Sequence, residues 1–199
     1  MTLNFNTEAE YIIEDEHVLL RPLTETDIMY LSPFALNEPE TWKYSHISAK
    51  GMVGMINYIA GALSAREAGK EYPFIVYDKQ TQAYAGSTRF YDIQPANQML
   101  QLGYTWYGGM FRGTGLNKHC KFLLLQLAFE RLCAERVEFR ADARNEASIA
   151  AMKSIGCRVE GILRSNMSLE EGGRRDSIVL SILKQEWENE VKENLKKRF

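Results

Sequence analysis

Cysteine is scarce in this sequence. Its 199 residues include only Cys120, Cys133 and Cys157, an odd number without a Cys-x-x-Cys spacing. This argues against a disulfide framework and against a zinc knuckle. Cys120 and Cys133 fall on or beside the apolar face of an expected helix, so we expect packing roles for them.

The sequence has few histidines and lacks the usual signature of a nucleophilic hydrolase. His17, His46 and His119 are scattered, with no metal-ligand spacing to cysteine or carboxylate residues. No Gly-x-Ser-x-Gly elbow accompanies them. We therefore expect neither a hydrolase triad nor a bound metal.

Long apolar runs and a strong net charge are also missing. No run approaches the roughly 18 apolar residues of a membrane span, and Met1–Ile13 contains acids but no basic residue, unlike a secretory signal. The net charge of -2 gives no broad footprint for nucleic acid or anionic lipid. We expect a cytoplasmic protein that binds neither nucleic acid nor membrane.

What the sequence does contain is the pattern of a globular α/β (α+β) protein. It is 45% hydrophobic and 25% charged, typical of one folded domain over residues 1–199. Short connections between three strand-like runs favour an antiparallel meander. Strands are expected at Val18–Leu23, Pro73–Tyr77, Ala83–Ile93, Met99–Tyr107, Val137–Ala141, Cys157–Arg164 and Ser177–Leu183. Helices are expected from the Thr24/Asp27 cap, from Met52 to Gly69, from Leu116 to about Cys133, from Asn145 to Gly156, and over about 184–199.

The densest chemical signal is a glycine-rich loop between a strand and a long helix. The loop is Gly108-Gly109-Met110-Phe111-Arg112-Gly113-Thr114-Gly115-Leu116-Asn117. Glycine permits sharp turns and close approach of a ligand, and the free amides of the helix start favour an anion such as a diphosphate. Arg112 would add a positive fork for phosphate oxygens. An ordinary strand-to-helix turn remains the alternative.

Two other phosphate-binding loops fit the sequence poorly. A P-loop needs a lysine directly after the glycine at position 113, where Thr114 stands instead. A dinucleotide fingerprint needs a third glycine inside a βαβ unit, but Lys118 occupies that position and the preceding strands look antiparallel. Neither the residues nor their context support these two motifs.

The loop resembles the acetyl-coenzyme A (acetyl-CoA) loop of the GNAT N-acetyltransferase superfamily. That pattern is Gln/Arg-x-x-Gly-x-Gly/Ala, here Arg112 to Asn117, with Asn117 departing from Gly/Ala. The variant Gly-Thr-Gly-Leu-Asn is similar to the branch of the ribosomal-protein N-terminal (Rim-type) acetyltransferases. Further segments suggest the same branch: Arg136–Arg140, Asn145-x-x-Ser148, Gly156, Glu160-Gly161 and Arg174–Asp176. The resemblance extends from about Val18 to Trp187.

The resemblance implies a fold and a co-substrate. The fold is a mixed, mostly antiparallel, seven-stranded twisted sheet flanked by helices, with its fourth and fifth strands splayed apart. Acetyl-CoA is the implied co-substrate, and its pantetheine arm would lie in the splay against the backbone of the fourth strand. The implied binding residues are Thr105, Trp106, Tyr107, Arg112, Gly113, Thr114, Gly115, Leu116, Asn117, Asn145 and Ser148.

The implied chemistry is acetyl transfer to a primary amine, and two positions depart from the usual pattern. Met152 stands where many relatives have a tyrosine acid, so the branch suggests Ser148 as the catalytic acid; its alternative role is a hydrogen bond within the first helical turn. Gln101 stands where relatives often have a glutamate base, and glutamine cannot accept the proton. We therefore expect an acceptor of low pKa, such as a protein or peptide N-terminal α-amine. Asp92 and Asp142 are candidate bases by chemistry alone.

Other functions stay open at this point. The chain could hold acyl-CoA without turnover, or acetylate a small amine such as a polyamine or an antibiotic. If the chain self-associates, a homodimer is the commonest arrangement.

Overall fold

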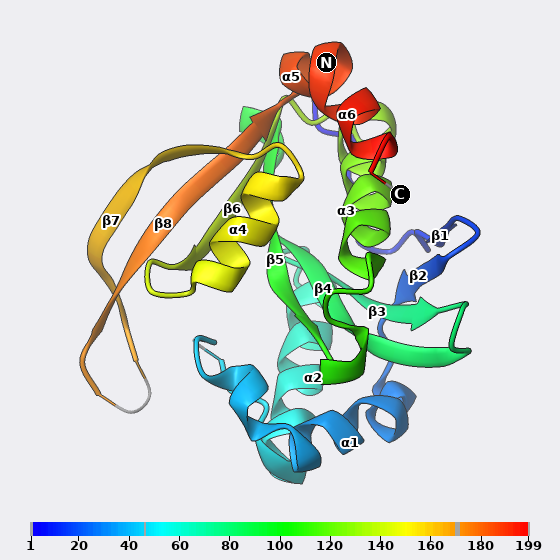
Figure 1. Ribbon diagram of the computed structural model, residues 1–199, viewed down its shortest axis with the longest axis vertical. Coiled ribbons are helices and arrows are strands. Elements are labelled where there is room, and N and C mark those ends of the chain that lie inside the picture. The colour runs from blue at the N-terminus through cyan, green and yellow to red at the C-terminus, as the bar shows by residue number, and fades with distance from the viewer. Residues whose placement is uncertain (1, 46, 170–171, 199) are drawn as a thin grey trace.

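The protein forms one eight-stranded sheet flanked by helices (Figure 1). A computed structural model describes residues 2–45, 47–169 and 172–198, so His46 and the two chain ends lie outside the described residues. The strands are β1 (Ile13–Glu14), β2 (Val18–Pro22), β3 (Tyr72–Asp78), β4 (Ala83–Gln94), β5 (Met99–Tyr107), β6 (Arg136–Asp142), β7 (Arg158–Ser168) and β8 (Arg174–Leu183). The helices are α1 (Ile28–Asn37), α2 (Gly51–Glu67), α3 (Leu116–Gln126), α4 (Glu146–Ser154), α5 (Lys184–Glu186) and α6 (Lys192–Lys196). Within the described residues, no helix is both long enough and apolar enough to span a bilayer.

The sheet order is β1-β2-β3-β4-β5-β6-β8-β7, and every neighbouring pair is antiparallel except β5 and β6. This confirms the mixed, mostly antiparallel sheet, but with eight strands where seven were expected. The additional strand is the two-residue β1, which pairs with β2. Asp15 closes this hairpin by accepting the N–H groups of His17 and Val18. Two residues are too few to show an alternating pattern in the sequence.

The parallel strands β5 and β6 separate soon after they meet. Their ladder has three pairs, ending at Gln101 opposite Glu138, although β5 continues to Tyr107 and β6 to Asp142. Figure 1 shows the two strands diverging toward the N-terminal end of α4. The expected splay is therefore confirmed, and it lies between the fourth and fifth of the seven expected strands.

A β-bulge in β5 lies just past the point of separation. Gly103 pairs with Arg89, but the next pair is Trp106 with Ser87, so Tyr104 and Thr105 together oppose Thr88. Tyr104 has φ +49°, a left-handed conformation that is uncommon outside glycine. The extra residue shifts the side-chain alternation of the strand by one.

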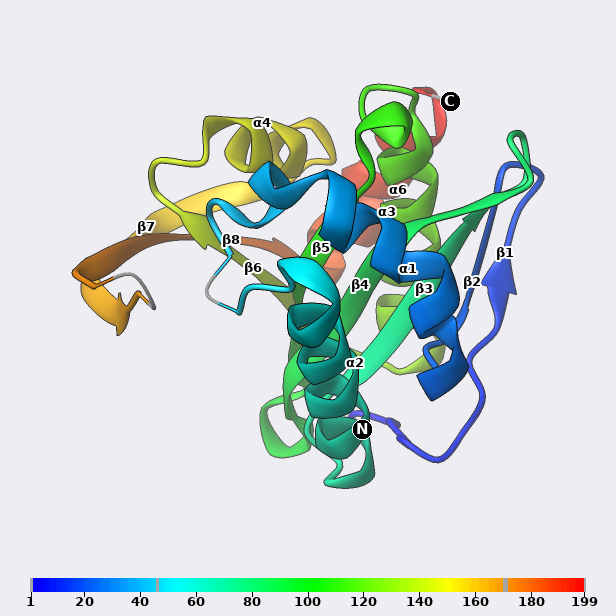
Figure 2. The same ribbon diagram turned by 90° about the horizontal axis from the view of Figure 1, so that it is seen from below.

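The bulge decides which side chains of β5 enter which core. Before it, Leu100 and Leu102 pack in the larger cluster, with α3. After it, Tyr107 packs in that cluster, whereas Trp106 packs in the second cluster with α1 and α2. Figure 2 shows α2 and α4 on opposite sides of the sheet. The bulge thus places Thr105 and Tyr107 on the same side as α3.

Local sequence signals explain where the helices start and stop. Thr24 and Asp27 form a capping box on a short 3-10 turn that leads into α1. Asn145 caps α4 through the N–H of Ser148, and Gly156, with φ +100°, follows its end. The C-terminal helix is interrupted by a π-helical turn over Trp187–Val191 and is described to Arg198.

Candidate active site

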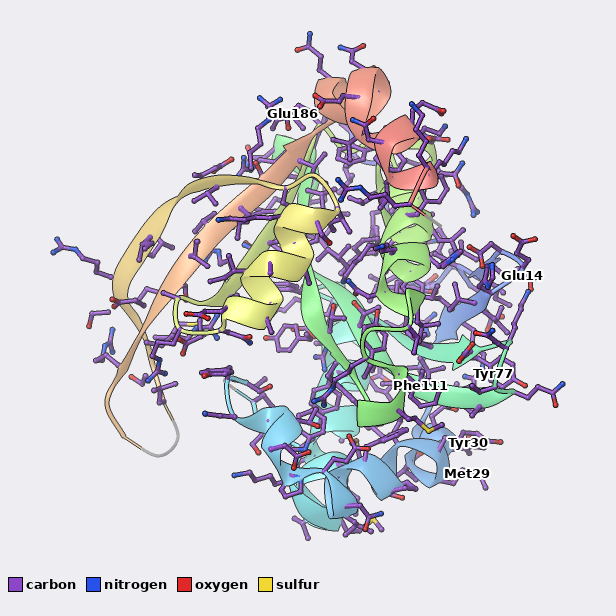
Figure 3. All side chains as sticks on the ribbon, viewed as in Figure 1. Glu14, Met29, Tyr30, Tyr77, Phe111 and Glu186 are labelled. Carbon is purple, nitrogen blue, oxygen red and sulfur yellow. The ribbon has the colours of Figure 1, made fainter. Side chains whose placement is uncertain are left out.

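The glycine-rich loop turns sharply and faces open space. Gly113 has φ +77° and Gly115 has φ +96°, and a Cβ built on either would meet no atom within 4 Å. Gly115 is the N-cap of α3, so the first-turn amides of that helix lie directly after it. Phe111, labelled in Figure 3, marks this loop between α3 and α1. The geometry fits a ligand that accepts hydrogen bonds from main-chain amides, such as a diphosphate.

Glycine is needed at position 108 for a steric reason. A Cβ on this residue would lie 2.2 Å from the ring of Phe34, a residue of α1. The neighbouring Gly109 donates its N–H to Glu38 Oε2 at 2.7 Å. The first part of the loop is therefore packed against α1 and its following turn, and only its second part faces open space.

Arg112 is turned back onto the protein. Its Nε donates to the carbonyl of Tyr107 at 2.9 Å and its Nη2 to Thr41 Oγ1 at 2.6 Å. Glu38 lies 3.9 Å from the same guanidinium. In this structure the arginine braces the loop against the turn after α1, and phosphate contact by Arg112 stays a prediction.

Asn117 has a structural partner that the sequence pattern does not reveal. Its Oδ1 accepts a hydrogen bond from Tyr107 Oη at 3.2 Å. Tyr107 is buried, and burial raises its pKa well above the usual value, so its hydroxyl stays protonated and donates. Asparagine at this position links the start of α3 to the end of β5, which glycine or alanine could not do. Leu116 beside it is buried in the larger core cluster.

Asn145 and Ser148 meet at the start of α4. Asn145 Oδ1 accepts the backbone N–H of Ser148 at 3.1 Å, a standard N-cap. The hydroxyl of Ser148 has no hydrogen-bond partner among residues 2–45, 47–169 and 172–198, so the alternative role within the first helical turn is not seen. Met152 is buried in the core. The hydroxyl of Ser148 is thus available, and its catalytic role stays a prediction.

The candidate carboxylates on β4 and β6 are already engaged. Asp92 accepts Gln101 Nε2 at 2.6 Å and Gln94 Nε2 at 3.1 Å. Asp142 is buried, and hydrogen bonds from Arg144 lower its pKa, which makes it a weak base at neutral pH. Gln101 is itself buried, and its Oε1 has no hydrogen-bond partner in the described part of the chain.

Two buried arginines lie outside the predicted site residues, although Arg175 falls in the Arg174–Asp176 segment that resembles the Rim-type branch. Arg89 on β4 has its guanidinium carbon 4.6 Å from the ring centre of Tyr58 and 4.2 Å from that of Tyr104, and it pairs with Glu71 at 2.6 Å. Arg175 on β8 is also buried, and its burial lowers its pKa. Within the described ranges, Nε of each arginine lacks a hydrogen-bond partner. For Arg89 the available signal was an arginine inside an aromatic strand run.

The described residues contain no group of three or more His, Cys, Asp or Glu side chains arranged to hold a metal ion. Nδ1 of His119 lies 2.7 Å from Asp15 Oδ2, and the His119 ring packs 4.2 Å from that of His17. His46 lies outside the described residues, so the structure gives no account of it.

With this geometry established, comparison with known proteins identifies relatives. The family profile described as acetyltransferase (GNAT) domain matches residues 17–158. A Bacillus subtilis protein, provisionally named the ribosomal N-acetyltransferase YdaF, is 31% identical over 128 residues, covering 64% of this chain and 64% of that relative. The match therefore spans slightly less than two thirds of the length of that relative.

Solved structures show the same fold. A provisionally assigned acetyltransferase from T. thermophilus is 33% identical, with a TM-score of 0.85, and the match covers 94% of this chain and 96% of that one. Mycobacterium smegmatis RimJ, solved with CoA-disulfide, superposes with a TM-score of 0.77 over 95% of this chain and 93% of its own. At 18% identity, RimJ supports the fold alone.

Proposed function

Because the chain belongs to the GNAT acetyltransferase family, a family of acetyl-CoA-dependent acyltransferases, we propose that it transfers the acetyl group of acetyl-CoA to a primary amine, specifically the N-terminal α-amine of a protein or peptide. One observation carries the proposal: Gly113 and Gly115 hold left-handed conformations with open space in front of the amides of α3. The resemblance to the Rim-type branch, and the name of the B. subtilis relative, favour a ribosomal protein as acceptor.

The donor side would bind acetyl-CoA mainly through the main chain. The amides from Gly113 to Asn117 would hold the diphosphate, with Thr114 fixed by its hydrogen bond to the Phe111 carbonyl. The backbone of Thr105 to Tyr107 would pair with the pantetheine arm, since β6 no longer pairs with β5 there. Asn145 would contact the arm beside its capping role. Apart from the Leu116 N–H, which donates to Thr114 Oγ1 at 3.4 Å, these assignments use groups that the sheet and the helices leave available.

The preference for an α-amine follows from the cost of deprotonating the acceptor. At pH 7 a lysine amine of pKa near 10.4 costs about 4 to 5 kcal/mol to hold neutral, whereas an α-amine near 7.7 to 8.0 costs only about 1 to 1.4 kcal/mol. Gln101 offers no base, and Asp92 and Asp142 are engaged by other side chains. A site with so little general-base capacity suits the acceptor of lower pKa.

Two further groups would serve the transfer step. A main-chain N–H at the bulge of β5 would stabilise the charge that develops on the acetyl oxygen, the kind of interaction that is often the largest catalytic contribution. The hydroxyl of Ser148 would protonate the departing thiolate and would then regain a proton from water. The proton lost by the amine would pass to water.

The test is acceptor-dependent release of free CoA thiol from acetyl-CoA. The panel contains a ribosomal-protein N-terminal peptide, the same peptide blocked at its α-amine but with a free lysine, a polyamine and an aminoglycoside. We expect release with the free α-amine peptide, at a rate that rises with pH as the α-amine deprotonates. Preference for lysine would contradict the acceptor assignment, and preference for the polyamine or aminoglycoside would indicate a small-molecule enzyme. Acetyl-CoA binding without release with any acceptor would indicate a binding module.

A further inference from the structure

A lysine is buried beneath the bulge of β5. Lys121 lies on α3 and is only 4% exposed. Its Nζ donates to Thr105 Oγ1 at 2.6 Å and to Thr88 Oγ1 at 3.3 Å. These two threonines are themselves hydrogen-bonded at 2.7 Å. The ammonium therefore bonds to both strands at the bulge, where Tyr104 and Thr105 together oppose Thr88.

The same network reaches the main chain of the bulge. The hydroxyl of Thr88 donates to the Gly103 carbonyl at 3.3 Å, and that of Thr105 lies 3.4 Å from the same oxygen. Gly103 is the last paired residue of β5 before the bulge, and the ladder between β5 and β6 has already ended at Gln101. Lys121 is thus the charged member of a hydrogen-bond network that holds β5 at the point where its other edge is unpaired.

This lysine is costly for the fold. Among the described residues no carboxylate pairs with it, and its recorded partners are the two neutral hydroxyls. Burial lowers its pKa to about 8. The titratable groups that face it are the thiols of Cys120 on α3 and Cys157 before β7, and burial raises the pKa of each thiol to about 12, so both stay neutral. A well-packed apolar side chain would fill the same space without this cost.

We propose that Lys121 is a positioning residue for acyl transfer: through Thr105 and Thr88 its ammonium fixes the β5 bulge in the shape that presents a main-chain N–H to the acetyl oxygen, and it adds positive charge behind that oxygen. The inference rests on the proposed function. It assigns the buried charge a role in the transfer step, not in binding acetyl-CoA. A preorganised positive field of this kind acts most strongly in a water-excluded site.

The first test compares Lys121→Met and Lys121→Arg with wild type and with Lys197→Met, which removes an exposed lysine near the C-terminus. We expect Lys121→Met to lower kcat at least tenfold while the KM for acetyl-CoA changes less than twofold. Lys121→Arg keeps the charge and should recover part of kcat. Lys197→Met should match wild type. An unchanged kcat in folded Lys121→Met, or a loss confined to KM, would overturn the inference.

The second test is the pH profile of kcat with the α-amine peptide. Wild-type activity should rise as the acceptor deprotonates and then fall as Lys121 loses its proton near pH 8. Lys121→Arg should lose the alkaline fall, because its guanidinium stays charged. An alkaline fall of equal size in both Lys121 variants would contradict the inference, since another group would then be responsible.

A double-mutant cycle shows whether the charge acts through the threonine. Thr105→Val removes the hydroxyl that lies closest to Nζ but keeps the main chain. If Lys121 acts through Thr105, the double variant should lose little more kcat than Lys121→Met alone; fully additive losses would refute the mechanism. If no acceptor in the panel makes the wild type release thiol, the proposed function fails and this inference fails with it. If the wild type is active and Lys121→Met is equally active, the inference fails but the proposed function stands.

Discussion

The two sides of the separated strands β5 and β6 offer different kinds of groups. On the side of α3 and α4, the candidate donor site consists of loop amides, two left-handed glycines and a helix cap. On the side of α2, buried side chains of Arg89, Gln101 and Arg175 hold polar atoms that lack partners within the described part of the chain. A main-chain site suits a ligand common to a whole family. A site made of side chains can differ from one relative to the next, which suits the acceptor.

The largest effect is expected where the donor side depends on backbone conformation. Gly115→Val places a β-branched residue at φ +96°, which L-residues avoid, and should weaken acetyl-CoA binding at least 1,000-fold, about 4 kcal/mol, by isothermal titration calorimetry. Gly61→Val is the matched control: its Cβ also meets open space, but it lies within α2. Equal binding by both variants would show that the loop is only a turn.

The next effect concerns the buried side chains on the side of α2. Arg89→Met leaves Glu71 without its partner and should lower the free energy of unfolding by about 3 kcal/mol, measured by urea denaturation. Arg158→Met, which breaks an exposed pair with Glu186, should cost less than about 1 kcal/mol. Acetyl-CoA affinity should be unchanged in folded Arg89→Met, and a large loss of that affinity would mean that the two sides are not separate.

Lys121 lies on the same side of the sheet as α3. Replacing it should stabilise the protein, whereas replacing Arg89 should destabilise it. For Lys121, the folded pKa of about 8 lies below the ordinary 10.5, so the unfolded chain binds the proton more tightly. The loss of folding stability caused by burying the charged lysine is fully present below about pH 8 and disappears as pH rises toward about 10.5. Lys121→Met should therefore stabilise the protein by about 2 kcal/mol at pH 7, after allowing for two lost hydrogen bonds, and by much less at pH 10. Denaturation at both pH values measures the gain; destabilisation at pH 7 would indicate a purely structural lysine.

The smallest effect concerns Ser148. If its hydroxyl protonates the leaving thiolate, Ser148→Ala should lower kcat about tenfold, at the lower end of acid–base contributions. Stability should change by less than about 0.5 kcal/mol, because the cap bond uses the backbone N–H of this residue. Asn145→Ala provides the contrast and should cost about 1 kcal/mol of stability by loss of the cap. An unchanged kcat in Ser148→Ala would leave thiolate protonation to water.

Local features of the fold and the candidate site could be predicted from the sequence. The loop, the Asn145 cap and the element order depend on residues close in the chain, where turn and cap chemistry is specific. The two-residue β1 was missed because it is too short to show an alternating pattern. Strand β7 ends later and β8 starts earlier than predicted, because their hairpin is mostly polar there.

Contacts between distant segments could not be predicted. Arg112 meets Thr41, and Lys121 meets Thr88, across separations that no local pattern encodes. The sequence also contains no sign of the bulge at Tyr104, because a bulge needs no particular residue when the surrounding ladder enforces it. These contacts determine where the charges of the site point, so its electrostatics had to come from the structure.

The bulge in β5 also affects how relatives should be aligned with this chain. In a relative with one residue fewer between Gly103 and Trp106, a single residue would oppose Thr88, and the residues aligned with Trp106 and Tyr107 would keep their faces of the sheet. The strand would then be regular, without the left-handed backbone of Tyr104 and without the extra residue that the bulge adds. Insertions and deletions at this position therefore distinguish relatives that can share the bulge from those that cannot.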